Sequence, residues 1–257
     1  MIQAIFFDVD GTLLSLTNHN ISPAVLDALY RLREKGIKLF LATGRHKSMV
    51  GDVLSRFPFD GYITLNGQYC FCGDQVLRSV PLDRKDMEHI VEATSAGAFS
   101  CIFMAAEDSF LNQPGPYTDL FPNELSLPLP RIEDPHLALE TDIFQLVAFV
   151  IKEDEHLLTD QTQHVHHMRW HPHFVDAIAD GGGKDKGIDV ILDHWKIPLE
   201  NSMAFGDGEN DLSMLTHVGI GVAMGAANDL VNSQADYVTG SVDEDGILTA
   251  LQHFGLL

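Results

Sequence analysis

The sequence has 257 residues, and its 16 Lys and Arg against 37 Asp and Glu give a formal net charge of −21 with His neutral. Binding to nucleic acid or to an anionic membrane requires a basic surface, so this balance argues against both kinds of partner. With 45% hydrophobic and 21% charged residues, the composition is that of a globular chain near the upper size for a single core. The first residues lack the basic and long apolar regions of a signal peptide, and three cysteines suit a reducing compartment, so we expect a cytoplasmic protein.

Strands and helices are expected to alternate in the N-terminal part of the chain. An apolar run at 2–7 predicts a buried strand, and Ser22, followed by proline, predicts the start of a helix that ends at Gly36. Further apolar runs at 37–42 and 61–65 predict two more strands. This β-α-β order predicts a parallel sheet with right-handed crossovers.

The C-terminal part repeats the alternation, whereas the middle does not. The expected C-terminal elements are a helix at about 186–195, a strand at 202–205, a helix after Glu209, a strand at 219–223 and a last helix ending near Phe254. Between about 82 and 179, prolines break the chain, and the strands expected at 100–105, 145–151 and 174–179 do not lead into acidic or glycine-rich loops. We therefore predict an α/β core with a parallel sheet formed by 1–81 and 182–257, with an inserted domain at 82–181.

The most informative segment follows the first expected strand. Residues 8–13 read Asp-Val-Asp-Gly-Thr-Leu, so two carboxylates, Asp8 and Asp10, lie at the carboxyl end of a strand, where open parallel sheets bind their ligands. One carboxylate can attack an electrophile while the other donates and accepts protons, and Gly11 lets the backbone turn behind them. Because two carboxylates repel a phosphate, a divalent cation with oxygen ligands is needed, which predicts Mg²⁺.

Three further segments supply what a phosphate would need. Thr43, Gly44 and Arg45 end the second strand and offer a hydroxyl and backbone N–H groups. Lys186, before Gly187, offers a positive charge at the start of a helix, and residues 206–211 (Gly-Asp-Gly-Glu-Asn-Asp) offer more carboxylates after another strand. Each segment alone could be a turn or a helix terminus, but together they predict a phosphate-handling site.

These four segments resemble, in order, the motifs of the haloacid dehalogenase (HAD) superfamily. The runs at 42–45, 66–67, 222–225 and 236–239 also resemble its Cof-type phosphatases, and within them the hexose-phosphate phosphatases. The resemblance implies a Rossmann-like parallel-sheet core with an inserted α+β cap of the C2 type that sets substrate specificity. It implies a phosphoric monoester hydrolase that forms an aspartyl-phosphate.

The resemblance also implies roles for individual residues. Asp8 would be the nucleophile, and Asp10 would protonate the leaving group and then activate water. The implied Mg²⁺ ligands are Asp8, Asp10, Asp207 and Asp211, the last directly or in support. The implied phosphate-binding residues are Thr43, Gly44, Lys186 and Asn210.

Two of the basic residues leave alternatives open. Lys186 matches the Lys-Gly pattern of the family and is the expected phosphate-binding lysine, with Lys184 as the alternative. Arg45 is a further candidate for contact with the phosphate or the cap, or for an ion pair with one of the many carboxylates.

Spacing and composition limit the function. Too few residues separate Asp8 from Thr43 for an inserted domain, while the next gap can hold a cap of about 100 residues, which argues against the mutases and dehalogenases of the superfamily. We therefore expect a Mg²⁺-dependent phosphatase of small sugar phosphates. The alternatives are a phosphatase of a nucleotide or of a cofactor phosphate such as pyridoxal phosphate or flavin mononucleotide, and a non-catalytic sugar-phosphate sensor. Five His in the segment 164–173 could bind a transition metal, but no carboxylate or Cys at ligand spacing accompanies them, so we expect a solvated cap strand and turn instead.

Overall fold

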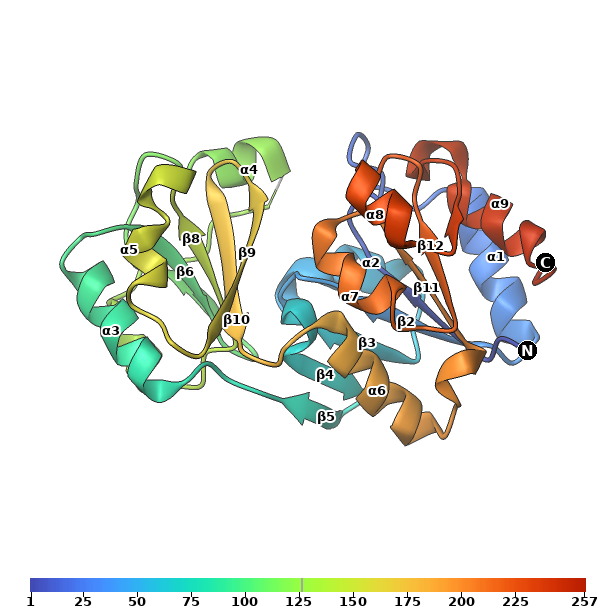
Figure 1. Cartoon of the computed structure of the whole chain (residues 1–257), viewed down its shortest axis with the longest axis horizontal. Helices are drawn as coiled ribbons and strands as arrows, with labels where there is room; N and C mark the ends of the chain where they lie inside the picture. The colour runs from blue at the N-terminus through green and yellow to red at the C-terminus, as the bar shows by residue number, and fades with distance from the viewer. Residues whose placement is uncertain (126) are drawn as a thin grey trace. The chain divides into compact units, whose positions relative to one another are not determined.

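The chain forms two compact units in the computed structural model (Figure 1). The model describes residues 1–125 and 127–257, so Ser126, which falls within the predicted cap, lies outside it. Unit 1 consists of Met1–Arg45, Val50–Arg78 and Gly183–Leu257, and unit 2 consists of His46–Met49 and Ser79–Gly182. Ser79–Gly182 overlaps the insert expected at 82–181, while the short piece His46–Met49 is a part of unit 2 that no sequence pattern marked.

Unit 1 is built on an eight-stranded sheet with the order β13-β12-β11-β1-β2-β3-β4-β5. Its strands are β1 (Ala4–Phe7), β2 (Lys38–Ala42), β3 (Gly61–Thr64), β4 (Tyr69–Cys72), β5 (Gln75–Ser79), β11 (Ser202–Gly206), β12 (Ile220–Ala223) and β13 (Tyr237–Val238). The strands from β13 to β3 are parallel, and β4 runs antiparallel to β3. The expected parallel sheet is therefore present, with an antiparallel hairpin at one edge that the sequence did not predict.

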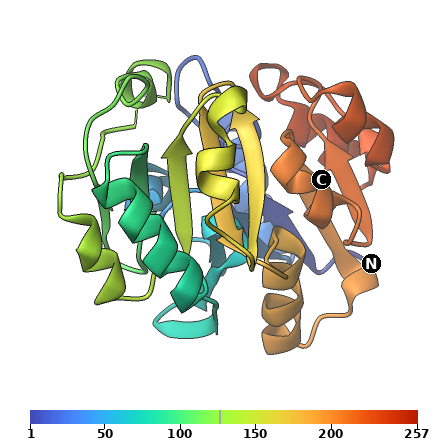
Figure 2. The ribbon, with the colours of Figure 1, turned by 60° about the vertical axis from the view of Figure 1, so that its left-hand side comes forward.

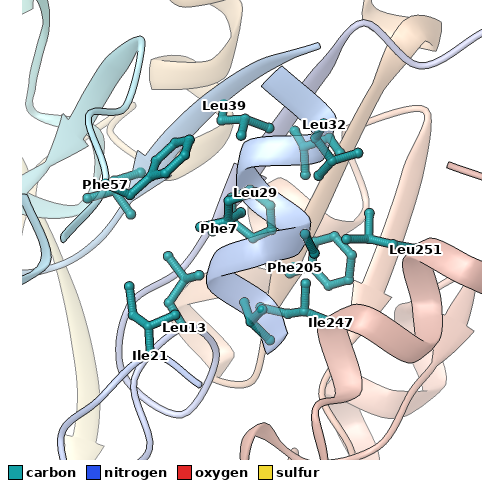
Figure 3. Packing of buried hydrophobic residues seen from close by; sticks show 14 of the residues in the cluster. Phe7, Leu13, Ile21, Leu29, Leu32, Leu39, Phe57, Phe205, Ile247 and Leu251 are labelled. Atoms are coloured by element: carbon teal, nitrogen blue, oxygen red, sulfur yellow. The ribbon is translucent and has the colours of Figure 1, made fainter. Parts of the chain in front are cut away.

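Helices cover both faces of this sheet. They are α1 (Pro23–Glu34), α2 (Gly51–Arg56), α6 (Lys184–Trp195), α7 (Leu212–Leu215), α8 (Asp229–Gln234) and α9 (Gly246–His253). Because side chains alternate along β1, Ile5 and Phe7 pack with α1, α2 and α9, and Ala4 and Phe6 pack with α6, α7 and α8. Figure 3 shows the first of these two cores around Phe7 and Phe205, whose rings stack. Burying each such ring contributes about 1.5–3 kcal/mol and fixes the strands that carry the site.

Two helix starts illustrate how far local sequence decides structure. Ser22 caps α1 by accepting the N–H of Val25 at 3.3 Å, as its sequence predicts. The helix α6 begins at Lys184 instead of near Lys186, with Gly183 at its N-cap in a left-handed conformation (φ 144°). Because glycine adopts this conformation freely, the helix can begin two residues earlier than expected, which moves the lysines relative to the sheet.

Unit 2 is built on a separate five-stranded antiparallel sheet with the order β7-β6-β8-β10-β9. Its strands are β6 (Ser100–Met104), β7 (Ser109–Leu111), β8 (Gln145–Phe149), β9 (Val165–His171) and β10 (Phe174–Ala179), and its helices are α3 (Arg84–Ser95), α4 (Leu120–Leu125) and α5 (His156–Thr159). Figure 2 shows α3 and α5 in front of the sheet, and buried side chains of both helices pack against the strands in one core. The unit thus has the α+β composition expected of the insert.

Within the described residues, no helix combines the length and apolar character needed to cross a membrane.

Candidate active site

The carboxyl ends of three neighbouring parallel strands bring the expected site residues to one edge of the unit 1 sheet. Asp8 follows β1, Thr43 follows β2 and Asp207 follows β11, and β1 pairs with both of the other strands in register. Residues that directly follow such strands lie side by side at the ligand-binding edge of the sheet. Residues that are far apart in the sequence are therefore brought close together at this edge of the sheet.

A buried lysine connects two of the carboxylates. Lys184 Nζ lies 2.7 Å from Asp8 Oδ1 and 2.5 Å from Asp211 Oδ1, and its side chain is fully buried. Asp211 Oδ2 accepts the backbone N–H groups of Asp207 and Gly208, each at 3.0 Å. Both oxygens of Asp211 are thus engaged by protein donors, which suits a residue that orients its neighbours.

The charges in this cluster do not balance. Burial, the largest cause, and the Asp211 carboxylate raise the pKa of Asp8 well above its ordinary value, against the opposing effect of Lys184. Burial would lower the pKa of Lys184, but the carboxylates of Asp211 and Asp8 outweigh it and hold that pKa above its ordinary value. The lysine is favourably paired, whereas the nucleophile candidate is not, because several carboxylates share one cation.

Asp207 completes the cluster next to the turn after β1. Burial and the Asp211 carboxylate raise the pKa of Asp207 to about 7, and the hydroxyl of Thr12 donates to Asp207 Oδ1 at 3.4 Å. Gly11 has φ 76°, and a Cβ at this position would lie 2.2 Å from Asp207 Oδ2. Glycine is therefore required here both for the turn and for the close approach of a carboxylate.

The cluster fits a divalent cation. Single oxygens of Asp8, Asp207 and Asp211 lie within 4.8 Å of one another, and these three carboxylates outnumber the one ammonium group of Lys184 by two charges. Hard oxygen donors of this kind suit Mg²⁺. Burial is the largest cause of the raised pKa values of Asp8 and Asp207, and a divalent cation would offset the repulsion between carboxylates that adds to it.

Asp10 lies apart from these contacts and pairs with Arg45. Arg45 Nε is 2.7 Å from Asp10 Oδ2, and Arg45 Nη2 is 2.5 Å from Asp10 Oδ1. The side chain of Asp10 is 42% exposed, and that of Arg45 is 13% exposed. Of the alternatives considered for Arg45, the structure shows an ion pair with a carboxylate.

The polar groups expected to hold phosphate lie around a left-handed loop. Leu65 and Asn66 both have φ 52°, and the loop places Asn66 Oδ1 3.2 Å from Asn210 Nδ2. The Asn66 amide also lies against Gly44, where a Cβ would come within 3.0 Å of it. Consecutive non-glycine residues with positive φ are uncommon and concentrate at functional sites. Asn66 is thus a residue of this site to which the sequence analysis gave no role, although it noted the Asn-Gly pair.

The two lysine candidates occupy different places in the structure. Lys186, the preferred candidate, is exposed and pairs with the adjacent Asp185 at 3.1 Å, whereas Lys184 occupies the carboxylate cluster. Two residues along a helix rotate a side chain by about 200°, so only one of the two can face the sheet. The difference between the two lysines follows from the start of α6, which lies two residues earlier than the sequence predicted.

The histidine-rich segment belongs to β9 in unit 2, in agreement with the strand interpretation. Arg169 is held by Glu155 at 2.9 Å, and the Trp170 indole N–H donates to Asp176 at 2.8 Å while 43% of the residue stays exposed. The rings of His171 and Phe174 stack at 4.2 Å. Trp170 is therefore an exposed aromatic side chain with a fixed orientation.

Comparisons with known proteins agree with this architecture. Residues 5–251 match the family of haloacid dehalogenase-like hydrolases. Putative phosphatase YkrA of Bacillus subtilis (strain 168) is 33% identical over 256 residues, which cover 99% of this chain and 98% of YkrA. Pyridoxal phosphate phosphatase YbhA of Escherichia coli (strain K12) is 28% identical over 95% of this chain and 96% of its own length. The solved structure of BT4131, a sugar phosphatase of HAD subclass IIB, matches with a TM-score of 0.91 and 37% identity over 99% of this chain and 100% of BT4131.

The chain therefore belongs to the haloacid dehalogenase-like hydrolases. It is a phosphatase of that family, with the α/β core and the additional antiparallel sheet that the Cof-type resemblance implied.

Proposed function

We propose that this phosphatase hydrolyses small phosphate monoesters of the hexose phosphate class, with Mg²⁺ as its cofactor and an aspartyl-phosphate as its intermediate. The observation that carries the proposal is the Asp8 carboxylate, held 2.7 Å from a buried lysine and grouped with Asp207 and Asp211. A buried carboxylate at the ligand-binding edge of a parallel sheet, with cations to neutralise phosphate, is the arrangement that phosphoryl transfer needs.

The chain's own residues divide the reaction into two steps. An oxygen of Asp8 attacks phosphorus, the bond from phosphorus to the ester oxygen breaks, and Asp10 gives its proton to the departing oxygen. Asp10 then takes a proton from water, whose oxygen attacks phosphorus, so that inorganic phosphate leaves and the Asp8 carboxylate is restored. Thr43, Gly44, Asn210 and Lys184 position the phosphoryl group.

Asp8 and Asp207 would hold the Mg²⁺, with the backbone carbonyl of Asp10, while Asp211 orients the loop through its backbone N–H contacts. When bound, the ion supplies positive charge that offsets the repulsion between these carboxylates and the phosphate dianion. Asp211 serves this group mainly by fixing Lys184 and the N–H groups of residues 207 and 208.

The proposed substrate class rests on relatives and on unit 2. BT4131, a sugar phosphatase, is 37% identical to this chain, while YbhA, a pyridoxal phosphate phosphatase, is 28% identical. We propose that unit 2 is the cap that selects the ester group, and an exposed indole such as that of Trp170 offers a flat apolar surface to a sugar ring. The cysteines among the described residues are free thiols, as suits the reducing cytoplasm in which we place the protein.

The test is a panel of hexose phosphates, pyridoxal phosphate, nucleotides and 4-nitrophenyl phosphate, each assayed with Mg²⁺ and with EDTA. We expect turnover of hexose phosphates with the highest kcat/KM, loss of turnover with EDTA, and loss in Asp8→Asn. Asp27→Asn, an exposed aspartate on α1, is the matched control and should retain activity. Turnover that survives Asp8→Asn would refute the mechanism, and a preference for pyridoxal phosphate would refute the substrate class.

A further inference from the structure

Arg45 binds both oxygens of Asp10, the residue proposed to move the proton. The two contacts, at 2.7 Å from Nε and 2.5 Å from Nη2, form the side-on pair in which a planar guanidinium fixes the plane of a carboxylate. Each carboxylate oxygen has two acceptor positions, so this pair leaves one position on each oxygen for a substrate or a water. Asp10 is also 42% exposed, so those positions are accessible.

Asp10 is surrounded by charges of its own sign. Its carboxylate contributes to raising the pKa of both Asp8 and Asp207, which shows that their charges interact. Lys184 is committed to Asp8 and Asp211. Arg45 supplies a positive charge next to Asp10, and this charge offsets the repulsion between Asp10 and the neighbouring carboxylates.

We propose that Arg45 is a positioning residue that holds Asp10 in the orientation needed for proton transfer to the ester oxygen and from water. This inference rests on the proposed function, because it assigns Arg45 a task only if Asp10 is the acid and base. We assign Arg45 a role through Asp10 because Nε and Nη2 both contact the oxygens of that carboxylate.

Arg45 lies in the chain directly before a segment of unit 2. Arg45 is the last residue of the first segment of unit 1, and His46 is the first residue of a segment of unit 2. His46 is buried, with Nε2 2.9 Å from the carbonyl oxygen of Ala105 and Nδ1 2.8 Å from the hydroxyl of Ser48. The residue proposed to orient Asp10 is thus covalently adjacent to a buried histidine of unit 2.

The experiment compares two leaving groups. An alkyl ester such as a hexose 6-phosphate needs a proton on its departing oxygen, whereas 4-nitrophenolate leaves without one. We expect Arg45→Gln to lower kcat/KM for the alkyl ester by about 10²-fold and for 4-nitrophenyl phosphate by less than about threefold. Arg45→Lys, which keeps the charge but not the planar pair, should fall between wild type and Arg45→Gln on the alkyl ester. Equal losses on both esters, or no loss, would overturn the inference.

A double-mutant cycle separates positioning from other roles. If Arg45 acts through Asp10, Arg45→Gln should cause no further loss in an Asp10→Asn background, whereas independent losses would overturn the inference. Arg31→Gln, which removes an arginine paired with Asp27 on the surface of α1, is the matched control and should leave both esters unchanged. Circular dichroism of each variant verifies folding.

The outcome is distinguishable from a failure of the proposed function. If wild type hydrolyses both esters and Asp8→Asn hydrolyses neither, the proposed function stands whatever Arg45→Gln does. If wild type hydrolyses neither ester, the function and this inference fall together.

Discussion

Buried carboxylates occur in both units, but their surroundings differ. In unit 1, Asp8 and Asp211 share one lysine and lie beside Asp207, so like charges are crowded together. In unit 2, Asp86 accepts the backbone N–H groups of Gln163 and His164 at 3.0 and 2.8 Å, which ties a loop to α3. A carboxylate that accepts backbone N–H groups, as Asp86 does, has a structural role. Crowded carboxylates destabilise the fold through their repulsion, so their presence indicates a functional site.

Asp83, Asp86 and His164 show why geometry alone is an insufficient criterion. One atom of each lies close enough to the others to hold a metal ion. Asp83 already caps α3 by accepting the N–H groups of Lys85 and Asp86, and both oxygens of Asp86 are engaged by backbone. We therefore assign this group to the structure of unit 2 and assign chemistry to unit 1.

The largest effect is expected where the crowded cluster loses its cation. Lys184→Met should reduce kcat/KM by about 10³-fold, because it removes the proposed donor to the phosphoryl group and leaves Asp8 Oδ1 and Asp211 Oδ1 without their cation. Lys186→Met, on the exposed side of the same helix, should change it by less than about twofold. Steady-state kinetics with Mg²⁺ measures both variants. A larger loss of kcat/KM in Lys186→Met than in Lys184→Met would identify Lys186 as the phosphate-binding lysine.

A smaller loss is expected from the turn that admits Asp207. Gly11→Ala places a methyl group against Asp207 Oδ2 and strains a backbone with φ 76°, so we expect kcat/KM to fall by about 10–100-fold. Gly36→Ala is the matched control, because Gly36 has φ 81° and nothing within 4 Å of an added Cβ. It should lose stability from the backbone strain but retain activity; equal activity losses would show that the strain and not the carboxylate contact matters.

Replacement of Asp207 and of Asp86 by asparagine should change the free energy of unfolding in opposite directions. The pKa of Asp207 is raised from 3.8 to about 7, so the folded chain binds this proton more tightly than the unfolded chain does. Its contribution to stability is therefore present below about pH 4 and is lost as the pH rises to about 7. With EDTA at pH 8, Asp207→Asn should raise the free energy of unfolding by about 1–3 kcal/mol.

Asp86→Asn should instead lower the free energy of unfolding by about 1–3 kcal/mol under the same conditions, since an amide cannot accept both backbone N–H groups. Urea titrations at pH 5 and pH 8 measure the two variants. Changes of the same sign would remove the distinction between the units.

The smallest effect is expected in substrate choice. Trp170→Ala should change the ratio of kcat/KM between a hexose phosphate and 4-nitrophenyl phosphate by about threefold to tenfold, by removing the proposed sugar-facing surface. Tyr30→Ala, an exposed aromatic residue of unit 1, should leave the ratio unchanged. An unchanged ratio in Trp170→Ala would contradict a role for this side chain in selection.

The sequence predicts the unit 1 sheet well because its strands are short apolar runs that end in acidic or glycine-rich loops. It places Asp8, Asp207 and Thr43 at one edge of the sheet because residues that directly follow neighbouring parallel strands meet there. It does not give the start of α6 at Lys184, which follows a glycine N-cap, or the place of Asn66, which depends on two residues with positive φ. The pair between Arg45 and Asp10 depends on side-chain orientation, which no local pattern encodes.

The central claim is that Asp8 becomes phosphorylated. The direct test is acid quenching of a single turnover with ³²P-labelled hexose phosphate and Mg²⁺, followed by peptide mapping. We expect label on the peptide that contains Asp8 in wild type, and no label in Asp8→Asn. Turnover in which no phosphorylated enzyme forms, or label that persists in Asp8→Asn, would contradict it.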